Sequence, residues 1–246
     1  MDRPGAKTHN YFRFLALALG FIALALILAS GPGTRSGWWG WPTGLTMVKW
    51  SFYVGAAAVV SGVALLLLHA LPSYRSHLWI PVTAIVCGLA AALPPYYLLH
   101  VAKTVPPIHD VTTDTVDPPA FVFLLEARRK SDNGFAYGGD AVAAQQKKAY
   151  PDIKPLILKA PPKDAVQAAI DAARSLGWEV MSSDAPAGRI EATDTTSWFG
   201  FKDDVVIRVR PEGAGSRVDV RSVSRVGESD LGANASRVRK FLSKMS

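Results

Sequence analysis

A histidine and three aspartates are grouped between residues 105 and 121, in a run that two proline pairs bracket. An imidazole beside carboxylates is suited to acid–base or nucleophilic hydrolysis, for which His109, Asp110 and Asp114 are the catalytic candidates. Carboxylate oxygens with one imidazole are also suited to a hard metal ion, which His109, Asp114 and Asp117 would bind. Aspartate near proline is also an ordinary turn residue, and we therefore favour a structural connector over either site.

A second group of chemically capable residues is formed by arginines on two predicted strands. They alternate with valine and isoleucine along 204–210 and 217–226, so their guanidinium groups should share one face of a sheet. Guanidinium groups bind phosphate and carboxylate oxygens in pairs. The alternative, which we favour, is a solvated face with cross-strand ion pairs to Glu191 and Asp219. The candidate ligand-binding residues are Arg208, Arg210, Arg221 and Arg225, with Arg217 beside them.

Motifs for known catalytic chemistries are missing from the sequence. It contains no G-x-S-x-G, no H-E-x-x-H, no phosphate-binding glycine loop and no G-x-G-x-x-G before a helix. The one cysteine, Cys87, excludes an intrachain disulfide and a cysteine-based metal site. We therefore predict no cofactor, and we expect binding or scaffolding rather than catalysis.

Three apolar runs without interior charges lie in the first part of the chain. Each is long enough to cross a bilayer, which takes about 20 residues. We predict a membrane anchor over 1–103, and the absence of ionisable groups from its interior favours an anchor over a transport pathway. A cleaved signal peptide is the alternative for the first run, but its long apolar core and poor cleavage site favour an uncleaved anchor. The predicted spans are about 14–30, 50–68 and 78–99.

Small and aromatic residues predict details of this anchor. Alanine and glycine recur at four-residue spacing within the runs, which lets helices pack closely. The loop 31–47 carries Trp38, Trp39 and Trp41, and indole rings favour the membrane–water interface. Pro94 and Pro95 should kink or end the third helix.

The net charge is distributed unevenly along the chain. Residues 1–103 carry seven Lys/Arg and one acid, whereas residues 104–246 carry twenty bases and nineteen acids. Basic residues flank the spans, where they set orientation, and the bases Arg3, Lys7, Arg13 and Arg75 place the N-terminus in the cytoplasm. Three crossings then place the C-terminal domain outside the cytoplasm. Its near neutrality argues against nucleic acid as a partner and leaves membrane lipid or another envelope protein.

The second part of the chain reads as an α+β domain. Residues 104–120 form a connector, and 121–246 show the order β-α-β-β-β-β-α, with short helices at 121–130 and 140–150 before it. This order predicts a two-layer domain in which helices cover one face of an antiparallel sheet and the other face is wet. Asp140 and Asp164 are expected to cap helices. The predicted strands are 155–160, 178–181, 189–198, 204–210 and 217–226, and the predicted long helices are 164–176 and 233–245.

Four stretches of this part resemble a bacterial family of uncharacterised proteins, domain of unknown function 1499. They are PPIHDVTTDTVDPPAF (106–121), AVAAQQKKAYPDI (141–153), GRIEATDTTSWFGFKDDVVIRVRP (188–211) and SRVDVRSVSRVGESDLGANASRVRKFL (216–242). The three preceding spans match one common architecture of that family. The resemblance implies a membrane-anchored envelope domain and carries no activity.

Two functions follow from these patterns. The first is a multi-pass protein of the bacterial inner membrane that presents an extracytoplasmic binding or scaffolding module. The alternative is an envelope hydrolase or metal-dependent enzyme that uses His109, Asp110, Asp114 and Asp117. An enzyme should hold His109 in a cleft with a second polar residue, whereas a scaffold should leave its side chain capping the backbone.

Overall fold

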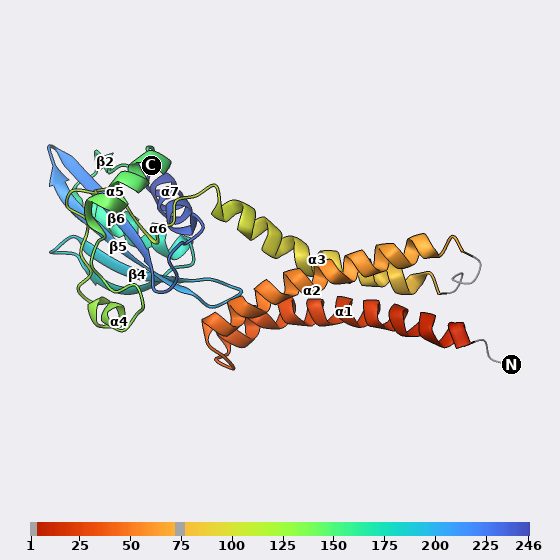
Figure 1. Cartoon of the computed structure of the whole chain (residues 1–246). Coiled ribbons are helices and arrows are strands. Elements are labelled where there is room, and N and C mark those ends of the chain that lie inside the picture. The colour runs from red at the N-terminus through yellow and green to blue at the C-terminus, as the bar shows by residue number, and fades with distance from the viewer. Residues whose placement is uncertain (1–3, 72–76) are drawn as a thin grey trace. The chain divides into compact units, whose positions relative to one another are not determined.

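The computed structural model describes residues 4–71 and 77–246 (Figure 1). It divides into two compact units, of which the first holds the residues up to Val101 with 197–200, and the second holds 102–196 and 201–246. Two of the bases on which the predicted orientation rests, Arg3 and Arg75, lie outside the described residues.

The first unit contains three long helices, α1 (Pro4–Arg35), α2 (Trp41–Leu68) and α3 (Trp79–Ala102). Among the described residues these three are long and apolar enough to cross a membrane, as predicted. The predicted loop 31–47 is wrong, because α1 continues to Arg35 and α2 already begins at Trp41. Pro42 explains the early start of α2, since proline is well tolerated in the first turn of a helix.

Pro94 and Pro95 lie inside α3 and do not end it. A proline at position 95 leaves the carbonyl oxygen of Ala91 without its usual intrahelical partner. The hydroxyl of Ser51 on α2 lies 3.4 Å from that oxygen. The same hydroxyl donates to the carbonyl oxygen of Val48 at 2.8 Å, so its contact with the carbonyl oxygen of Ala91 is a weak one.

Glycines bring α2 and α3 together, as the small-residue spacing predicts. A Cβ atom on Gly88 would lie 2.6 Å from the carbonyl oxygen of Gly55, and one on Gly55 would lie 2.7 Å from that of Gly88. Any larger side chain at either position would push the two backbones apart.

The second unit is built on an antiparallel sheet. The described residues form six strands in the order β1-β6-β5-β4-β3, with β2 also paired to β6. The predicted sheet is confirmed, and β1, which lies inside the predicted connector, is an addition to it. The strands are β1 (Asp110–Thr112), β2 (Leu156–Leu158), β3 (Glu179–Asp184), β4 (Arg189–Thr195), β5 (Lys202–Glu212) and β6 (Gly215–Ser224).

Two helices, α6 (Pro162–Ser175) and α7 (Ala233–Met245), cover one face of the sheet (Figure 1). Val205, Ile207 and Val209 of β5 and Val218 and Val220 of β6 pack against them. Trp178 stacks on Phe241 with ring centres 5.5 Å apart. The helices α4 (Leu125–Arg129) and α5 (Gly139–Ala149) precede them. The predicted caps are wrong: α5 follows Gly138 and α6 follows Pro161, neither with a side-chain cap.

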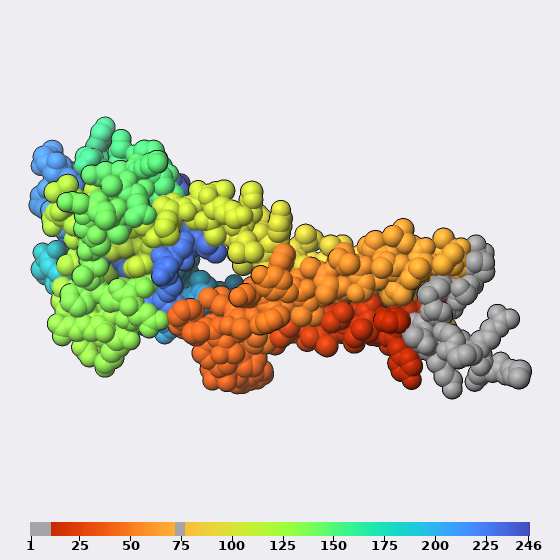
Figure 2. Space-filling model, in the orientation of Figure 1, coloured from red at the N-terminus to blue at the C-terminus, as the bar shows by residue number. Residues whose placement is uncertain are grey.

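The opposite face of the sheet is not simply wet, which corrects the prediction. Phe121 and Leu124 pack against Val206 and Val223 from β5 and β6. These two valines lie on the face that also carries the arginines. The covering segment 113–137 therefore takes the place of solvent over part of this face, and Figure 2 shows residues of this region in light green at the surface of the second unit.

Replacing Val220 by Asp should unfold the second unit. Val220 is fully buried among the helices, and an unpaired buried charge costs more than the stability of about 5–15 kcal/mol that a domain has. Urea unfolding of the full chain in detergent, followed by pulse proteolysis of the second unit, measures the effect. The matched control is Ile157→Asp, because Ile157 is a strand residue that is 58% exposed; equal effects of both changes would contradict this assignment of the faces.

Candidate functional site

Three arginines meet on the second face of the sheet. Arg208 and Arg210 lie on β5 and Arg217 lies on β6, where the register pairs Arg210 with Arg217 and Arg208 with Asp219. Residues two apart on a strand point to the same face. The predicted alternation therefore holds, and it brings three guanidinium groups around one aspartate.

Asp219 is the central acceptor of these arginines, and its side chain is fully buried. Its Oδ2 atom accepts hydrogen bonds from Nη2 of Arg208 at 3.1 Å and from Nη2 of Arg210 at 2.9 Å. Nε of Arg217 donates to Oδ1 at 3.1 Å. A buried carboxylate is stable only when charged donors surround it in this way.

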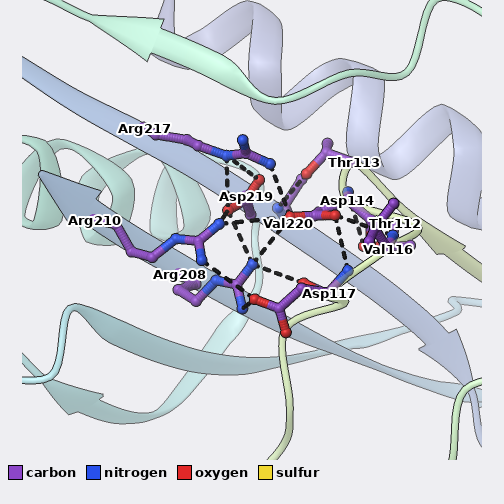
Figure 3. A network of polar contacts seen from close by, with 10 residues as sticks. All are labelled: Thr112, Thr113, Asp114, Val116, Asp117, Arg208, Arg210, Arg217, Asp219 and Val220. Atoms are coloured by element: carbon purple, nitrogen blue, oxygen red, sulfur yellow. Dashed lines mark hydrogen bonds and ion pairs between the residues drawn. The ribbon is translucent and has the colours of Figure 1, made fainter. Parts of the chain in front are cut away.

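Two connector aspartates complete the group (Figure 3). Asp114 Oδ2 accepts from Nη2 of Arg217 at 2.8 Å, and Asp117 Oδ2 accepts from Nη1 of Arg208 at 2.9 Å. The connector aspartates and the arginine face, which the sequence suggests as separate candidates, thus belong to one cluster. We call it the arginine–aspartate network: Asp114, Asp117, Arg208, Arg210, Arg217 and Asp219.

The environment of Asp114 favours its charged form. Burial raises the pKa of this carboxyl, but the backbone N–H groups of Asp117 and Val116 and the charges of Arg217 and Arg208 outweigh that effect, so its pKa lies below the ordinary 3.8. For Arg217, burial lowers the pKa, but the hydrogen bond to Asp219 and the charges of Asp219, Asp114 and Glu212 together outweigh that effect, so its pKa lies above its ordinary value. Three arginines and three aspartates leave the network without net charge at neutral pH.

Exposure within the network rises from the sheet outward. The Asp219 side chain is 0% exposed, that of Asp114 11% and that of Asp117 66%. Arg210 is the most open of the three arginines, with 39% of its side chain exposed. Solvent and ligands therefore reach the network at Asp117 and Arg210.

The other two candidate arginines lie outside this network. Arg221 is buried, forms a two-point ion pair with Asp110 at 3.0 and 2.7 Å, and lies over the rings of Phe121 and Tyr137. Arg225 makes a similar pair with Asp204 at 2.9 and 2.8 Å. Arg221 thus joins β6 to β1, and Arg225 holds the residue after β6 to β5.

His109 lies apart from the aspartates that the sequence groups with it. Its Nδ1 atom is 3.2 Å from the carbonyl oxygen of Glu228, a backbone contact. Asp110 is paired with Arg221 and Asp114 with Arg217, so the candidate catalytic trio is dispersed. In the part of the chain that the structure describes, no three His, Cys, Asp or Glu residues are placed to hold a metal ion.

Two buried residues on this face have roles that the sequence does not reveal. Glu191 was expected to form a cross-strand ion pair with an arginine; it lies 3.6 Å from Nε of Arg189 on its own strand. Its carboxylate also accepts the N–H groups of residues 122–124 at 2.8 to 3.0 Å. Arg128 is fully buried and donates to the carbonyl oxygen of Val223 at 3.0 Å. Arg128 begins a run of three basic residues, which is typical of a solvated helix end. The sequence therefore gives no local signal that Arg128 is buried.

A surface pocket of about 410 Å³ lies beside the connector. Gln146 lines it, but its amide is already bonded to the N–H and carbonyl groups of Thr112, at 2.9 and 2.6 Å. The amide thereby closes the outer edge of β1. The other lining residues are Thr113, Thr115, Lys147, Tyr150, Pro151, Ile153 and Lys154.

Comparison with known proteins relates the second unit to one family. A family model described as a protein of unknown function, DUF1499, matches residues 110–245. The match runs from β1 to α7 and includes the whole network. A search among curated proteins finds no match to the chain.

The difference in burial predicts unequal effects for the most buried and the most exposed aspartate of the network. Asp219→Asn should lower the free energy of unfolding by about 3–5 kcal/mol, because it removes a buried negative charge and one of the two acceptor oxygens that the three arginines share. Asp117→Asn should lower it by less than about 1 kcal/mol, because Asp117 is largely exposed. Urea unfolding with pulse proteolysis of the full chain gives both values, and similar losses would show that the network is not graded by burial.

Proposed function

This chain belongs to the DUF1499 family, and from that premise we propose that it is a multi-pass membrane protein with a binding or scaffolding domain. In this proposal the α+β domain lies on the non-cytoplasmic side of a bacterial inner membrane. It acts on membrane lipid or on another envelope protein, and it does not use nucleic acid.

One observation carries the choice of binding over catalysis. The aspartates near His109 are engaged: Asp110 by Arg221, and Asp114 and Asp117 by the arginines of β5 and β6. A general base or nucleophile needs a carboxylate or imidazole free to reach a substrate. Paired guanidinium groups at a partly exposed surface are instead suited to recognition of an anionic partner.

The orientation is supported by the distribution of bases. Those of the N-terminal segment flank the first span on one side, and positive residues are retained on the cytoplasmic side of membranes. An odd number of spans then places the two ends of the chain on opposite sides.

A reporter that is active only in the cytoplasm should be silent when fused after Ser246. The same reporter fused to the N-terminus should be active, which controls for expression and insertion. Activity at the C-terminal fusion would reverse the proposed orientation.

A photo-crosslinking residue in place of Val116 tests the binding role in native membranes. The side chain of Val116 is 89% exposed and does not pack in the core. Its backbone N–H donates to Oδ1 of Asp114, a member of the network. We expect an adduct with one lipid class or one envelope protein. The control position is Ala168, which is exposed on α6, the helix that covers the opposite face of the sheet. Equal adducts at both positions, or none at Val116, would contradict a binding surface at the network.

A further inference from the structure

The exposed end of the network has the geometry of an anion site that the chain itself fills. We propose that Arg208 and Arg210 bind a carboxylate or phosphate group, and that the side chain of Asp117 occupies this site until the ligand displaces it. This inference rests on the proposed binding function and names the class of ligand.

Two guanidinium groups converge on one oxygen atom at this point. Nη1 of Arg208 lies 2.9 Å and Nη1 of Arg210 lies 3.2 Å from the same atom, Oδ2 of Asp117. The two arginines are two positions apart on β5, so the strand itself sets their spacing. Charged donors at such distances are suited to any carboxylate or phosphate oxygen placed where Oδ2 lies.

The side chain of Asp117 can leave without moving the connector. Its backbone is held separately, because its N–H donates to Asp114 Oδ1 at 3.0 Å and its carbonyl oxygen accepts from Arg208 Nη2 at 2.7 Å. The carboxylate itself is 66% exposed. Exposed side chains change rotamer within picoseconds to nanoseconds, so ligand entry requires only a rotation about the side-chain bonds of Asp117.

The other members of the network keep their positions when Asp117 turns away, and they set the charge of the site. Asp219 is fully buried and Asp114 is nearly so, and both keep their arginine contacts when Asp117 turns away. Three guanidinium groups then face two carboxylates, which leaves one positive charge at Arg208 and Arg210. A singly charged oxyanion restores the balance that Asp117 provides in the closed state.

Titration of the full chain in a neutral detergent, followed by ³¹P NMR line broadening, tests this site. The probes are inorganic phosphate and a short-chain phosphatidylglycerol. Asp117→Asn should tighten binding about two- to fivefold, because an exposed ion pair is a weak competitor for the ligand. Arg210→Gln should abolish binding without a large change in Tm, because Arg210 is the most exposed arginine of the network.

The matched control is Asp152→Asn. Asp152 is 54% exposed, against 66% for Asp117, and pairs with Arg239 at 2.6 Å, so this change removes a largely exposed, paired carboxylate elsewhere on the domain. It should leave binding of both probes unchanged. If phosphatidylglycerol alone binds, the site recognises a lipid headgroup. If both probes bind, the site recognises the phosphate group itself.

Equal affinities of the Asp117→Asn and Asp152→Asn variants would overturn the proposal, as would binding that survives Arg210→Gln. Absence of binding in both the wild type and Asp117→Asn would also overturn it. In those cases a specific adduct at position 116 would still support the binding role, so the two proposals fail separately.

Discussion

The buried carboxylate of Asp219 is the constraint on which the second face of the sheet depends. A charge with no access to water is stable only if oppositely charged donors surround it. Arg208 and Arg217 meet this need from β5 and β6 themselves. The positive charges of these arginines require further acceptors, and Asp114 and Asp117 of the connector supply them. The position of the connector follows from the need to balance charges that the sheet carries.

The same arrangement recurs at three other points of the sheet. Asp110 is paired with Arg221, Asp203 with Arg237 from α7, and Asp204 with both Arg128 and Arg225. These pairs join β1, α7, α4 and the residue after β6 to neighbouring strands. Pairs of this kind add little net stability, but breaking one is costly, so they specify where each segment is placed.

The first unit follows a different constraint. Its helices are long and apolar enough to cross a membrane, and each helix bonds most of its backbone groups internally. Pro94 and Pro95 interrupt this pattern without ending α3. Gly55 and Gly88 let α2 and α3 pack closely.

The sequence alone determined the features that depend on local patterns. The length of the apolar runs predicts the three spans. The alternation along β5 and β6 predicts which side chains face α6 and α7, and it places the arginines on the opposite face. Local patterns left open whether Pro94 and Pro95 kink or end the third helix, and the structure places both inside α3. They also missed the early start of α2, where Pro42 lies in the first turn. Asp140 and Asp164 are ordinary cap residues by type, but their helices begin after Gly138 and Pro161.

Only the tertiary structure decided which candidates form one site. Asp114 and Arg217 are separated by 103 positions, and no spacing rule links them. Asp110 and His109 are neighbours in the sequence, yet one pairs with Arg221 and the other contacts the backbone of Glu228. The physical reason is that charge pairing acts through space: β1 pairs with β6, and this pairing carries the connector aspartates to the arginines.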